Sequence, residues 1–395
     1  NTGDYRNETI LVKGARTFEF ERITNAISDK IHGTVLEINL NAINDNLNFY
    51  RSRLGPGVKL MVMVKASAYG TGSWEVANLL QYNRVDYLAV AYPDEGVELR
   101  KHGITMPVMV MNVVPESFGN IVKYQLEPEI FSLSQLRLLI SYLEQEGQQA
   151  AIHIKVDTGM RRLGFEYKDI GPLCQLLYST RCLSIKSIYT HLAASDEVQH
   201  DHFTHEQVTK YQEFCKQLYV YTGEGVLKHV LNSAGIHRFP EYQFDMVRLG
   251  IGLYGFDADA TIQSFLRPIS KLKTVISQIK NVRKGDTVGY GRKGIEKRDS
   301  TIATIAIGYA DGFSRSFSNG KISLHVKGKL APVIGNVCMD MTMLDITGID
   351  AKEGDEVIVF GENPTIAQLA QTIGTIPYEI LTGISSRVLR IFYTG

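Results

Sequence analysis

The sequence predicts an α/β protein in which an N-terminal TIM (β/α)8 barrel is followed by a C-terminal antiparallel β domain. The length of 395 residues suits two or three domains of about 100–200 residues each. From residue 35 to about residue 255, short apolar runs alternate with helical patterns, as in repeated βα units. After residue 270 the pattern changes to short strands separated by Gly, Asp and Asn turns, which is typical of an antiparallel β domain.

The composition limits the class of partner. Hydrophobic residues make up 44% and charged residues 21% of the chain, so wholesale disorder is excluded. Lys plus Arg and Asp plus Glu both total 42, so no global positive field attracts nucleic acid or an anionic membrane. The longest apolar stretches, such as residues 60–64, are far shorter than the ~20 residues that cross a bilayer. A small-molecule partner is therefore favoured.

The cysteines indicate the compartment. The chain has four, and they show neither Cys-x-x-Cys nor Cys/His metal-ligand spacing. Four thiols in so long a chain do not make a disulfide framework. We therefore expect a cytoplasmic protein without a metal site.

Nine runs are predicted to be strands of the barrel, one more than it needs, so one of them is expected to be wrong. They are Val35–Leu40, Leu60–Lys65, Tyr87–Tyr92, Pro107–Asn112, Leu126–Phe131, Ala150–Asp157, Ile185–His191, Lys228–Asn232 and Met246–Tyr254. Helical patterns between them are Trp74–Gln81, Glu95–His102, Ser134–Gln145 and His202–Tyr219. A doubly wound sheet would give the same local signals, but about 220 residues of alternation suit a TIM barrel.

The rest of the chain completes the domain division. The β domain is predicted from the strands Lys273–Val282, Thr301–Ile307, Lys321–Val326, Ala331–Ile334, Met341–Ile346 and Glu356–Phe360. Near the start, Thr9–Lys13 is predicted to be a strand and Phe18–Lys30 a helix, and neither fits the barrel. We therefore assign residues 1–31 to a residual tail or linker, 32–270 to the barrel and 271–395 to the β domain.

Lys65 is the first candidate for chemistry. It ends an apolar strand and precedes a turn of small residues, 66–72. Burial at the C-terminal mouth of a strand lowers a lysine's pKa and frees the amine to attack a carbonyl carbon, as a Schiff-base lysine must. The alternative is a lysine that simply extends into solvent at a strand end.

Two other predicted strands end in polar residues. Alternation places Lys155 and Asp157 on one face, where a structural salt bridge or a partly buried network would form. His191 ends the next predicted strand. It could act as an acid, a base or a hydrogen-bond relay at the mouth of the barrel, or it could be a core histidine whose ring nitrogens are hydrogen-bonded within the protein.

The last two strands of the predicted barrel end in small residues. Ser233, Gly250 and Ile251 are placed to hold a phosphate with hydroxyl and backbone N–H groups, although plain turns would look the same. In the β domain, the segments 307–313 and 335–340 look like ordinary β turns in isolation. Tyr378 could equally be an amphipathic surface residue.

Taken in order, these segments resemble pyridoxal-phosphate alanine racemases over about residues 35–392. The resemblance rests on motifs at long spacings: residues 64–70 (VKASAYG), 155–162 (KVDTGMRR), 232–234 (NSA), 248–255 (RLGIGLYG), 307–312 (IGYADG) and 338–340 (CMD). It implies the barrel and the β domain predicted above.

The resemblance also implies a racemisation that uses two bases on opposite faces of the substrate carbon. Lys65 would hold pyridoxal phosphate and act as the base on the face of the D-enantiomer. Tyr309, supplied by the partner subunit of a homodimer, would be the base for the L-enantiomer. Arg248 would face the pyridine nitrogen and keep it unprotonated, and His191 would link Arg248 to Tyr309.

Binding roles follow from the same resemblance. The cofactor phosphate would be held by Tyr69, Ser233, Tyr378 and the backbone of Gly250 and Ile251. Arg162 and the backbone at Met339 would meet the substrate carboxylate. Lys155, carbamylated in many members, would orient Arg162. Arg161, where a smaller residue is common, adds a charge beside Arg162.

The opening residues carry a second resemblance. The segment 10–16 (ILVKGAR) is similar to the C-terminal end of a Mur ligase, as in bifunctional bacterial proteins that fuse such a ligase to a racemase. The resemblance implies a possible fusion partner and a role in supplying D-alanine for peptidoglycan synthesis.

Three other functions stay open. A serine racemase of the same fold would differ by one substrate hydroxyl, which a pocket rejects only weakly. A related decarboxylase of basic amino acids would need an acidic residue in place of Arg248. A carrier of pyridoxal phosphate without turnover would not need the second base, Tyr309.

Overall fold

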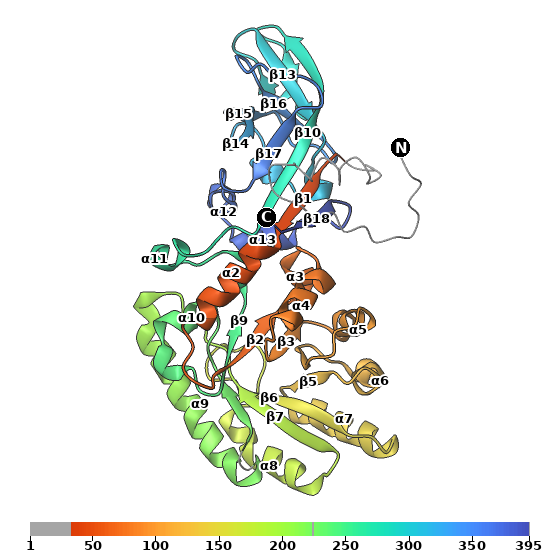
Figure 1. The fold of residues 1–395 in the computed structure, drawn as a ribbon, viewed down its shortest axis with the longest axis vertical. Helices are drawn as coiled ribbons and strands as arrows, with labels where there is room; N and C mark the ends of the chain where they lie inside the picture. Colours follow the sequence, from red (N-terminus) through yellow and green to blue (C-terminus); the bar gives the residue numbers. More distant parts are fainter. Residues whose placement is uncertain (1–32, 223–224, 395) are drawn as a thin grey trace. The chain divides into compact units, whose positions relative to one another are not determined.

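The computed structural model describes residues 33–222 and 225–394, which divide into two compact units (Figure 1). One unit comprises residues 42–268. The other combines residues 33–41 with residues 269–394. The predicted strand Thr9–Lys13 and helix Phe18–Lys30 lie outside the described residues.

The first unit is a TIM barrel. Its strands, in chain order, are β2 (Lys59–Met63), β3 (Tyr87–Val90), β4 (Val108–Val110), β5 (Glu127–Ile130), β6 (Ala150–Lys155), β7 (Leu183–Tyr189), β8 (Leu227–His229) and β9 (Met246–Leu249). Neighbours from β2 to β8 pair in parallel, and β9 pairs in parallel with β2. Backbone bonds close the ring between β8 and β9, because Asp245 N donates to Lys228 O (3.1 Å) and Arg248 N to Leu231 O (3.0 Å).

Helices lie outside the ring of strands (Figure 1). They are α2 (Leu40–Arg51), α3 (Lys65–Tyr69), α4 (Ser73–Tyr82), α5 (Pro93–Lys101), α6 (Phe118–Lys123), α7 (Leu133–Gln145), α8 (Ile170–Ser179), α9 (Asp201–Thr222), α10 (Ser233–Arg238) and α11 (Ala260–Gln263). The four predicted helices correspond to α4, α5, α7 and α9. At the start of α7, the Ser132 side chain caps the helix by accepting a hydrogen bond from Gln135 N.

The prediction that Val35–Leu40 is a barrel strand is wrong. These residues form β1 (Val35–Asn39), which pairs antiparallel with β10 and parallel with β18 in the sheet of the second unit. Its alternating half-buried and buried residues fit a sheet with one covered face, whereas β3 is buried throughout. Residues 33–41 therefore belong with the β domain, and the other eight predicted strands supply the barrel.

The second unit is the expected β domain. Its elements after β1 are β10 (Ser270–Val282), β11 (Thr287–Val288), β12 (Gly294–Ile295), β13 (Ser300–Ile305), β14 (Ser323–Val326), β15 (Lys329–Ile334), β16 (Thr342–Asp345), β17 (Glu356–Phe360), α12 (Ile366–Ile373), α13 (Pro377–Thr382) and β18 (Leu389–Tyr393). All pairs of its large sheet are antiparallel except β1 with β18. The long β10 pairs with β1, β17 and β13 in turn, with a register shift in its pairing with β17 and another in its pairing with β13.

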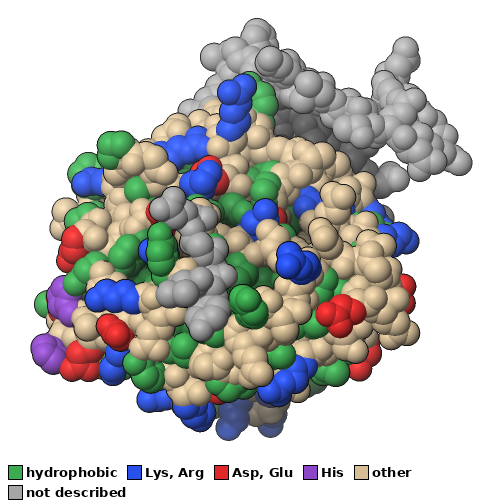
Figure 2. All heavy atoms as spheres, turned by 90° about the horizontal axis from the view of Figure 1, so that it is seen from below, with side chains coloured by type: hydrophobic (Ala, Val, Ile, Leu, Met, Phe, Trp, Pro, Cys, Tyr) green, Lys and Arg blue, Asp and Glu red, His purple; other side chains and the backbone are tan. Residues whose placement is uncertain are grey.

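The surface fits the equal numbers of basic and acidic residues in the sequence. Basic, acidic and apolar side chains are interspersed on the face drawn in Figure 2. The cysteines at positions 174, 182, 215 and 338 are free thiols. Across the two described stretches of chain, no helix has both the length and the apolar character needed to cross a bilayer.

Candidate active site

Lys65 stands at the C-terminal mouth of β2, where the backbone turns in an unusual way. The four residues after it, 66–69, all have φ between 50° and 56°, in the left-handed region, and none is glycine. Such a conformation costs about 1–2 kcal/mol per residue for an L-amino acid. Hydrogen bonds hold the turn, including Ala68 N to Val64 O (3.0 Å) and Gly70 N to Ala66 O (2.8 Å). The strained turn fixes the point from which the lysine side chain leaves the backbone.

Glu95, which the sequence did not single out, ties this turn to the next strand. Its Oε1 accepts a hydrogen bond from Ala66 N (2.6 Å), and its Oε2 accepts from Ala91 N (2.7 Å). The carboxylate at the start of α5 therefore joins the mouths of β2 and β3.

The barrel interior beside Lys65 is charged rather than apolar. Lys155 Nζ lies 3.1 Å from Glu129 Oε1, and both side chains are buried. The hydroxyl of Tyr189 donates to the other oxygen of Glu129. Burial lowers the pKa of Lys155 and raises the pKa of Glu129, so both groups depend on each other for their charge. The predicted carbamylation of Lys155 stays a prediction; the described partner of its amine is a carboxylate.

Arg248 has a buried guanidinium that is held by three backbone carbonyls and by histidine ring nitrogens. Its Nη1 donates to His229 Nδ1 (2.8 Å) and to His229 O (3.3 Å), and its Nη2 donates to Thr190 O (2.9 Å) and Val230 O (3.0 Å). Nη2 also lies 3.5 Å from His191 Nδ1. Among the described residues, none accepts a hydrogen bond from Nε of Arg248.

The neutral form is favoured at both neighbouring histidines. Burial, followed by the charge of Arg248, holds the pKa of His191 and of His229 well below its usual range. Of these three neighbouring side chains, the guanidinium is the one that carries a positive charge.

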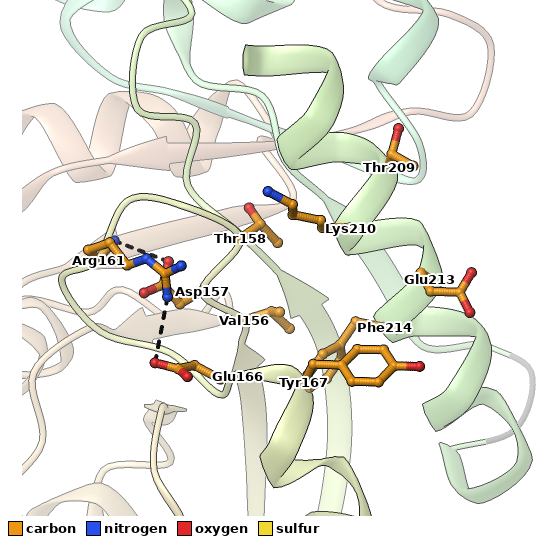
Figure 3. A pocket seen from close by; sticks show the side chains of 10 residues that line it. All are labelled: Val156, Asp157, Thr158, Arg161, Glu166, Tyr167, Thr209, Lys210, Glu213 and Phe214. Atoms are coloured by element: carbon orange, nitrogen blue, oxygen red, sulfur yellow. Dashed lines mark hydrogen bonds and ion pairs between the residues drawn. The ribbon is translucent and has the colours of Figure 1, made fainter. Parts of the chain in front are cut away.

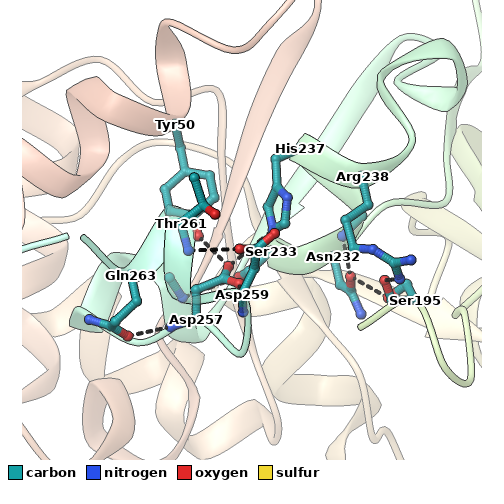
Figure 4. Close-up of polar contacts among 12 residues, drawn as sticks. Tyr50, Ser195, Asn232, Ser233, His237, Arg238, Asp257, Asp259, Thr261 and Gln263 are labelled. Carbon is teal, nitrogen blue, oxygen red and sulfur yellow. Dashed lines mark hydrogen bonds and ion pairs between the residues drawn. The ribbon is translucent and has the colours of Figure 1, made fainter. Parts of the chain in front are cut away.

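A small polar cradle lies at the ends of β8 and β9. Ser233 Oγ accepts from Gly250 N (2.9 Å) and Gly252 N (3.3 Å). A Cβ on Gly250 would lie 3.1 Å from the Tyr69 hydroxyl and 3.6 Å from Ser233 Oγ, so these predicted phosphate ligands converge, with Ile251 next in the chain. Figure 4 shows Asn232 and Ser195 side by side, to the right of Ser233, and Ser195 Oγ donates a hydrogen bond of 2.8 Å to Asn232 Oδ1.

Arg162 lies on a loop that folds back onto β6. Phe165 N donates to Lys155 O (2.9 Å), while Asp157 Oδ1 accepts from Gly159 N (2.9 Å) and Arg161 N (3.1 Å). Arg162 is exposed, and its charge reaches Lys65 electrostatically. Burial, followed by the charge of Arg162, lowers the pKa of Lys65.

We expect Arg162→Gln to slow the reaction of Lys65 with an aldehyde. Removing the Arg162 charge raises the pKa of Lys65, so a smaller share of the amine is unprotonated at neutral pH. The measurement is the rate of pyridoxal phosphate uptake by the cofactor-free protein as a function of pH, whose midpoint should move to higher pH. Arg161→Gln is the matched control, because the Arg161 guanidinium pairs with Glu166 (3.7 Å) and should leave the midpoint in place. An equal shift in both variants would contradict the assignment.

Three predicted site residues form a second group within the β domain. Tyr309 N donates to Cys338 O (3.0 Å) and Ala310 N to Met339 O (3.0 Å), so the structure brings the Tyr309 and Met339 segments together. Tyr378 lies on α13. Gly383, the residue after this helix, lies against Gly312 in the turn that follows Tyr309.

An ion pair with a buried carboxylate secures this group. Arg387 Nε donates to Asp311 Oδ1 (2.7 Å), and its Nη2 donates to Asp340 Oδ1 (2.5 Å). The guanidinium therefore joins the residue two beyond Tyr309 to the residue that follows Met339. The sequence offered no signal for Arg387, which lies far away in the chain.

Gly308→Ala should destabilise the β domain. A Cβ at this position would lie 2.3 Å from Met339 O and 2.4 Å from Cys338 O, both backbone atoms. Overpacking of this kind costs about 1–3 kcal/mol, which urea unfolding would measure. Gly171→Ala in α8 is the control, since a Cβ there would have no atom within 4 Å and the free energy of unfolding should not fall. A loss of the same size at Gly171 would contradict the steric argument.

Comparison with known proteins decides the family. The family model for the N-terminal domain of alanine racemase matches residues 38–258, and the model for its C-terminal domain matches residues 269–392. The chain belongs to the alanine racemase family.

Individual alanine racemases agree over nearly the whole chain. Alanine racemase 2 of Caldanaerobacter subterraneus subsp. tengcongensis is 40% identical over 93% of this chain and 97% of its own. The structure of the Clostridium difficile 630 alanine racemase is 37% identical, with a TM-score of 0.86, over 92% of this chain and 96% of its own. That of the Bartonella henselae enzyme with covalently bound pyridoxal phosphate is 28% identical, with a TM-score of 0.83, over 91% and 99%. The chain is therefore an enzyme, an isomerase of the alanine racemase type.

A hollow in the barrel unit of this racemase is lined by Val156 and Arg161, which are chain neighbours of Lys155 and Arg162. It occupies about 430 Å³ beside α9 and the loop after β6, and its lining includes Arg161, Glu166, Tyr167 and Lys210 (Figure 3). None of the predicted catalytic or cofactor-binding residues lines it. Convergent side chains, and not a hollow, therefore define the candidate site.

Proposed function

We propose that the chain interconverts L-alanine and D-alanine with pyridoxal 5'-phosphate, using Lys65 and Tyr309 as the two bases. The observation that carries the proposal is the guanidinium of Arg248. Its terminal nitrogens are occupied by carbonyls and by His229, and its Nε–H is left for an acceptor. An unprotonated pyridine nitrogen is such an acceptor, so the residues present fit this cofactor.

The remaining cofactor contacts follow from the cradle. Tyr69, Ser233 and the backbone N–H groups of Gly250 and Ile251 would hold the phosphate, with Tyr378 completing the set. Lys65 would bind the aldehyde carbon through Nζ, for which its lowered pKa prepares it. When bound, pyridoxal phosphate supplies the electron sink that makes the α-proton of the amino acid acidic.

The residues of the chain divide the proton transfers. Nζ of Lys65 would remove or return the α-proton on one face, and the phenol oxygen of Tyr309 from the partner subunit would do so on the other. Arg162 and the backbone at Met339 would bind the substrate carboxylate, and His191 would connect Arg248 with Tyr309. An Arg beside the ring nitrogen keeps it unprotonated, which restrains side reactions such as transamination.

The competing functions fit less well. An acidic partner for the ring nitrogen, as the decarboxylase requires, is replaced by Arg248. A carrier without turnover has no use for the ion pair that secures the Tyr309 segment. Serine racemisation needs the same groups, and the bulk of Tyr378 favours alanine. The product D-alanine would serve peptidoglycan synthesis in the cytoplasm, the compartment that the cysteine spacing favours.

Two measurements on the purified protein test the proposal. An absorbance spectrum should show the band of lysine-bound pyridoxal phosphate, and circular dichroism should show L-alanine losing its optical activity much faster than L-serine. A cofactor band without any loss of optical activity would support the carrier, and faster loss with L-serine would support the serine racemase.

A further inference from the structure

A chain of hydrogen bonds crosses the barrel interior below Arg248. His229 Nε2 lies 2.8 Å from Ser187 Oγ, and Ser187 Oγ lies 2.7 Å from His153 Nδ1. His153 Nε2 lies 2.9 Å from Glu127 Oε2. The three inner members, from β6, β7 and β8, are fully buried. This series of hydrogen bonds thus joins Arg248 on β9 to the carboxylate of Glu127 at the start of β5.

Its two ends impose the same direction on every bond. A guanidinium only donates, so His229 Nδ1 must accept and the proton of the neutral ring is on Nε2. His229 then donates to Ser187, whose hydroxyl proton is directed to His153 Nδ1. A His153 ring with one proton then carries it on Nε2 and donates it to Glu127. A carboxylate only accepts hydrogen bonds, so Glu127 at one end requires the same donor and acceptor roles along the series as Arg248 requires at the other end.

Neighbouring groups keep this arrangement rigid. The Tyr189 ring stacks on the His229 ring, with centroids 4.9 Å apart and planes at 7°. The guanidinium carbon of Arg248 lies 5.0 Å from the centroid of the same Tyr189 ring. At the far end, Tyr87 packs edge-on against His153 with centroids 5.7 Å apart, and burial together with Glu127 raises the pKa of Tyr87. Aromatic rings therefore pack against both histidines, Tyr189 on the face of His229 and Tyr87 on His153.

We propose that Ser187, His153 and Glu127 are positioning residues that fix the tautomer of His229 and thereby the orientation of Arg248. With the other tautomer, an N–H at Nδ1 of His229 would face an N–H of Arg248 across 2.8 Å, and the guanidinium would have to move. The Nε–H of Arg248 would then no longer lie where the proposed function needs it, opposite the pyridine nitrogen of the cofactor. Only the expected effect on catalysis rests on the proposed function. The donor-to-acceptor direction of the hydrogen bonds does not depend on it.

The direct test reads the tautomers by NMR. In holoenzyme labelled with ¹⁵N-histidine, long-range ¹H–¹⁵N correlations should show the ring protons of His229 and His153 on Nε2. His229→Gln and His153→Gln assign the two signals. A proton on Nδ1 of either ring in the unsubstituted protein would overturn the proposal.

Ser187→Ala removes the hydroxyl at the centre of this series of hydrogen bonds. We expect His229 to lose its single tautomer and kcat for alanine racemisation to fall about tenfold, as for other partners that orient a functional ligand. KM should stay nearly constant, because the proposed carboxylate ligands are untouched. Ser187→Thr, which restores the hydroxyl, should recover both the tautomer and kcat.

Tyr211→Phe is the matched control. It removes another buried hydroxyl bond to the same strand, from Tyr211 to Ile188 O (2.6 Å), outside the chain. This variant should keep both tautomers and kcat even if it is less stable. A Ser187→Ala protein with the unsubstituted tautomers, or with a kcat no lower than that of Tyr211→Phe, would overturn the proposal. If alanine is not racemised at all, the proposed function fails, while the tautomers still decide the direction of the chain.

Discussion

Lys65→Ala should abolish racemisation in both directions, with a loss of about 10³-fold or more. The variant loses the group that holds the aldehyde carbon and one of the two proposed bases. The reaction needs a proton removed from one face and returned on the other, so both directions should fail together. The measurement is the loss of optical activity, starting from each enantiomer of alanine.

Lys59→Ala is the matched control for this loss. Lys59 begins the same strand, β2, at its opposite end, where its ammonium pairs with Asp86 (3.4 Å). Its removal should leave turnover unchanged. After borohydride reduction of the unsubstituted protein, mass mapping should find the pyridoxyl group on Lys65. A label on another lysine, or a Lys65→Ala protein that still racemises, would refute the assignment.

Mixing Lys65→Ala subunits with Tyr309→Phe subunits should restore activity that neither variant has alone. In a homodimer with shared sites, each site takes Lys65 from one chain and Tyr309 from the other. A mixed dimer then has one site with both defects and one intact site. Random exchange makes about half of the dimers mixed, so up to about a quarter of the unsubstituted activity should return.

Each variant incubated with itself provides the control for subunit exchange. Labels of different mass on the two chains would show that mixed dimers have formed. No recovery in their presence would mean that Tyr309 acts within its own chain or has no role as a base.

The barrel strands could be predicted because each shows a local pattern. Continuous apolar runs such as β2 and β3 occur in parallel strands covered on both faces. Which sheet a strand joins is not a local property, and this misled the assignment of β1. The available signal was the alternation of Leu36 and Ile38 with the polar residues Glu37 and Asn39.

Local pattern singled out candidate residues that stand at strand ends, whereas Arg248, inside β9, was singled out only by the family resemblance. Lys65 interrupts an apolar run at its end, so it is visible in the sequence. Glu129 lies inside β5 and His229 is the last residue of β8, and both were missed because their burial depends on partners from neighbouring strands. A signal did exist, since the strand Glu127–Ile130 has two carboxylates on one face.

The place of β1 in the second unit has a consequence for how the protein is made. As the chain leaves the ribosome, β1 emerges first of the described strands, while its partners β10 and β18 come about 230 and 350 residues later. The whole barrel can close in the meantime, with Leu36 and Ile38 still lacking the sheet that buries them. Gene truncation near residue 268 would leave this apolar strand without a partner and prone to edge-to-edge association. An expression experiment for the isolated barrel should therefore start after β1.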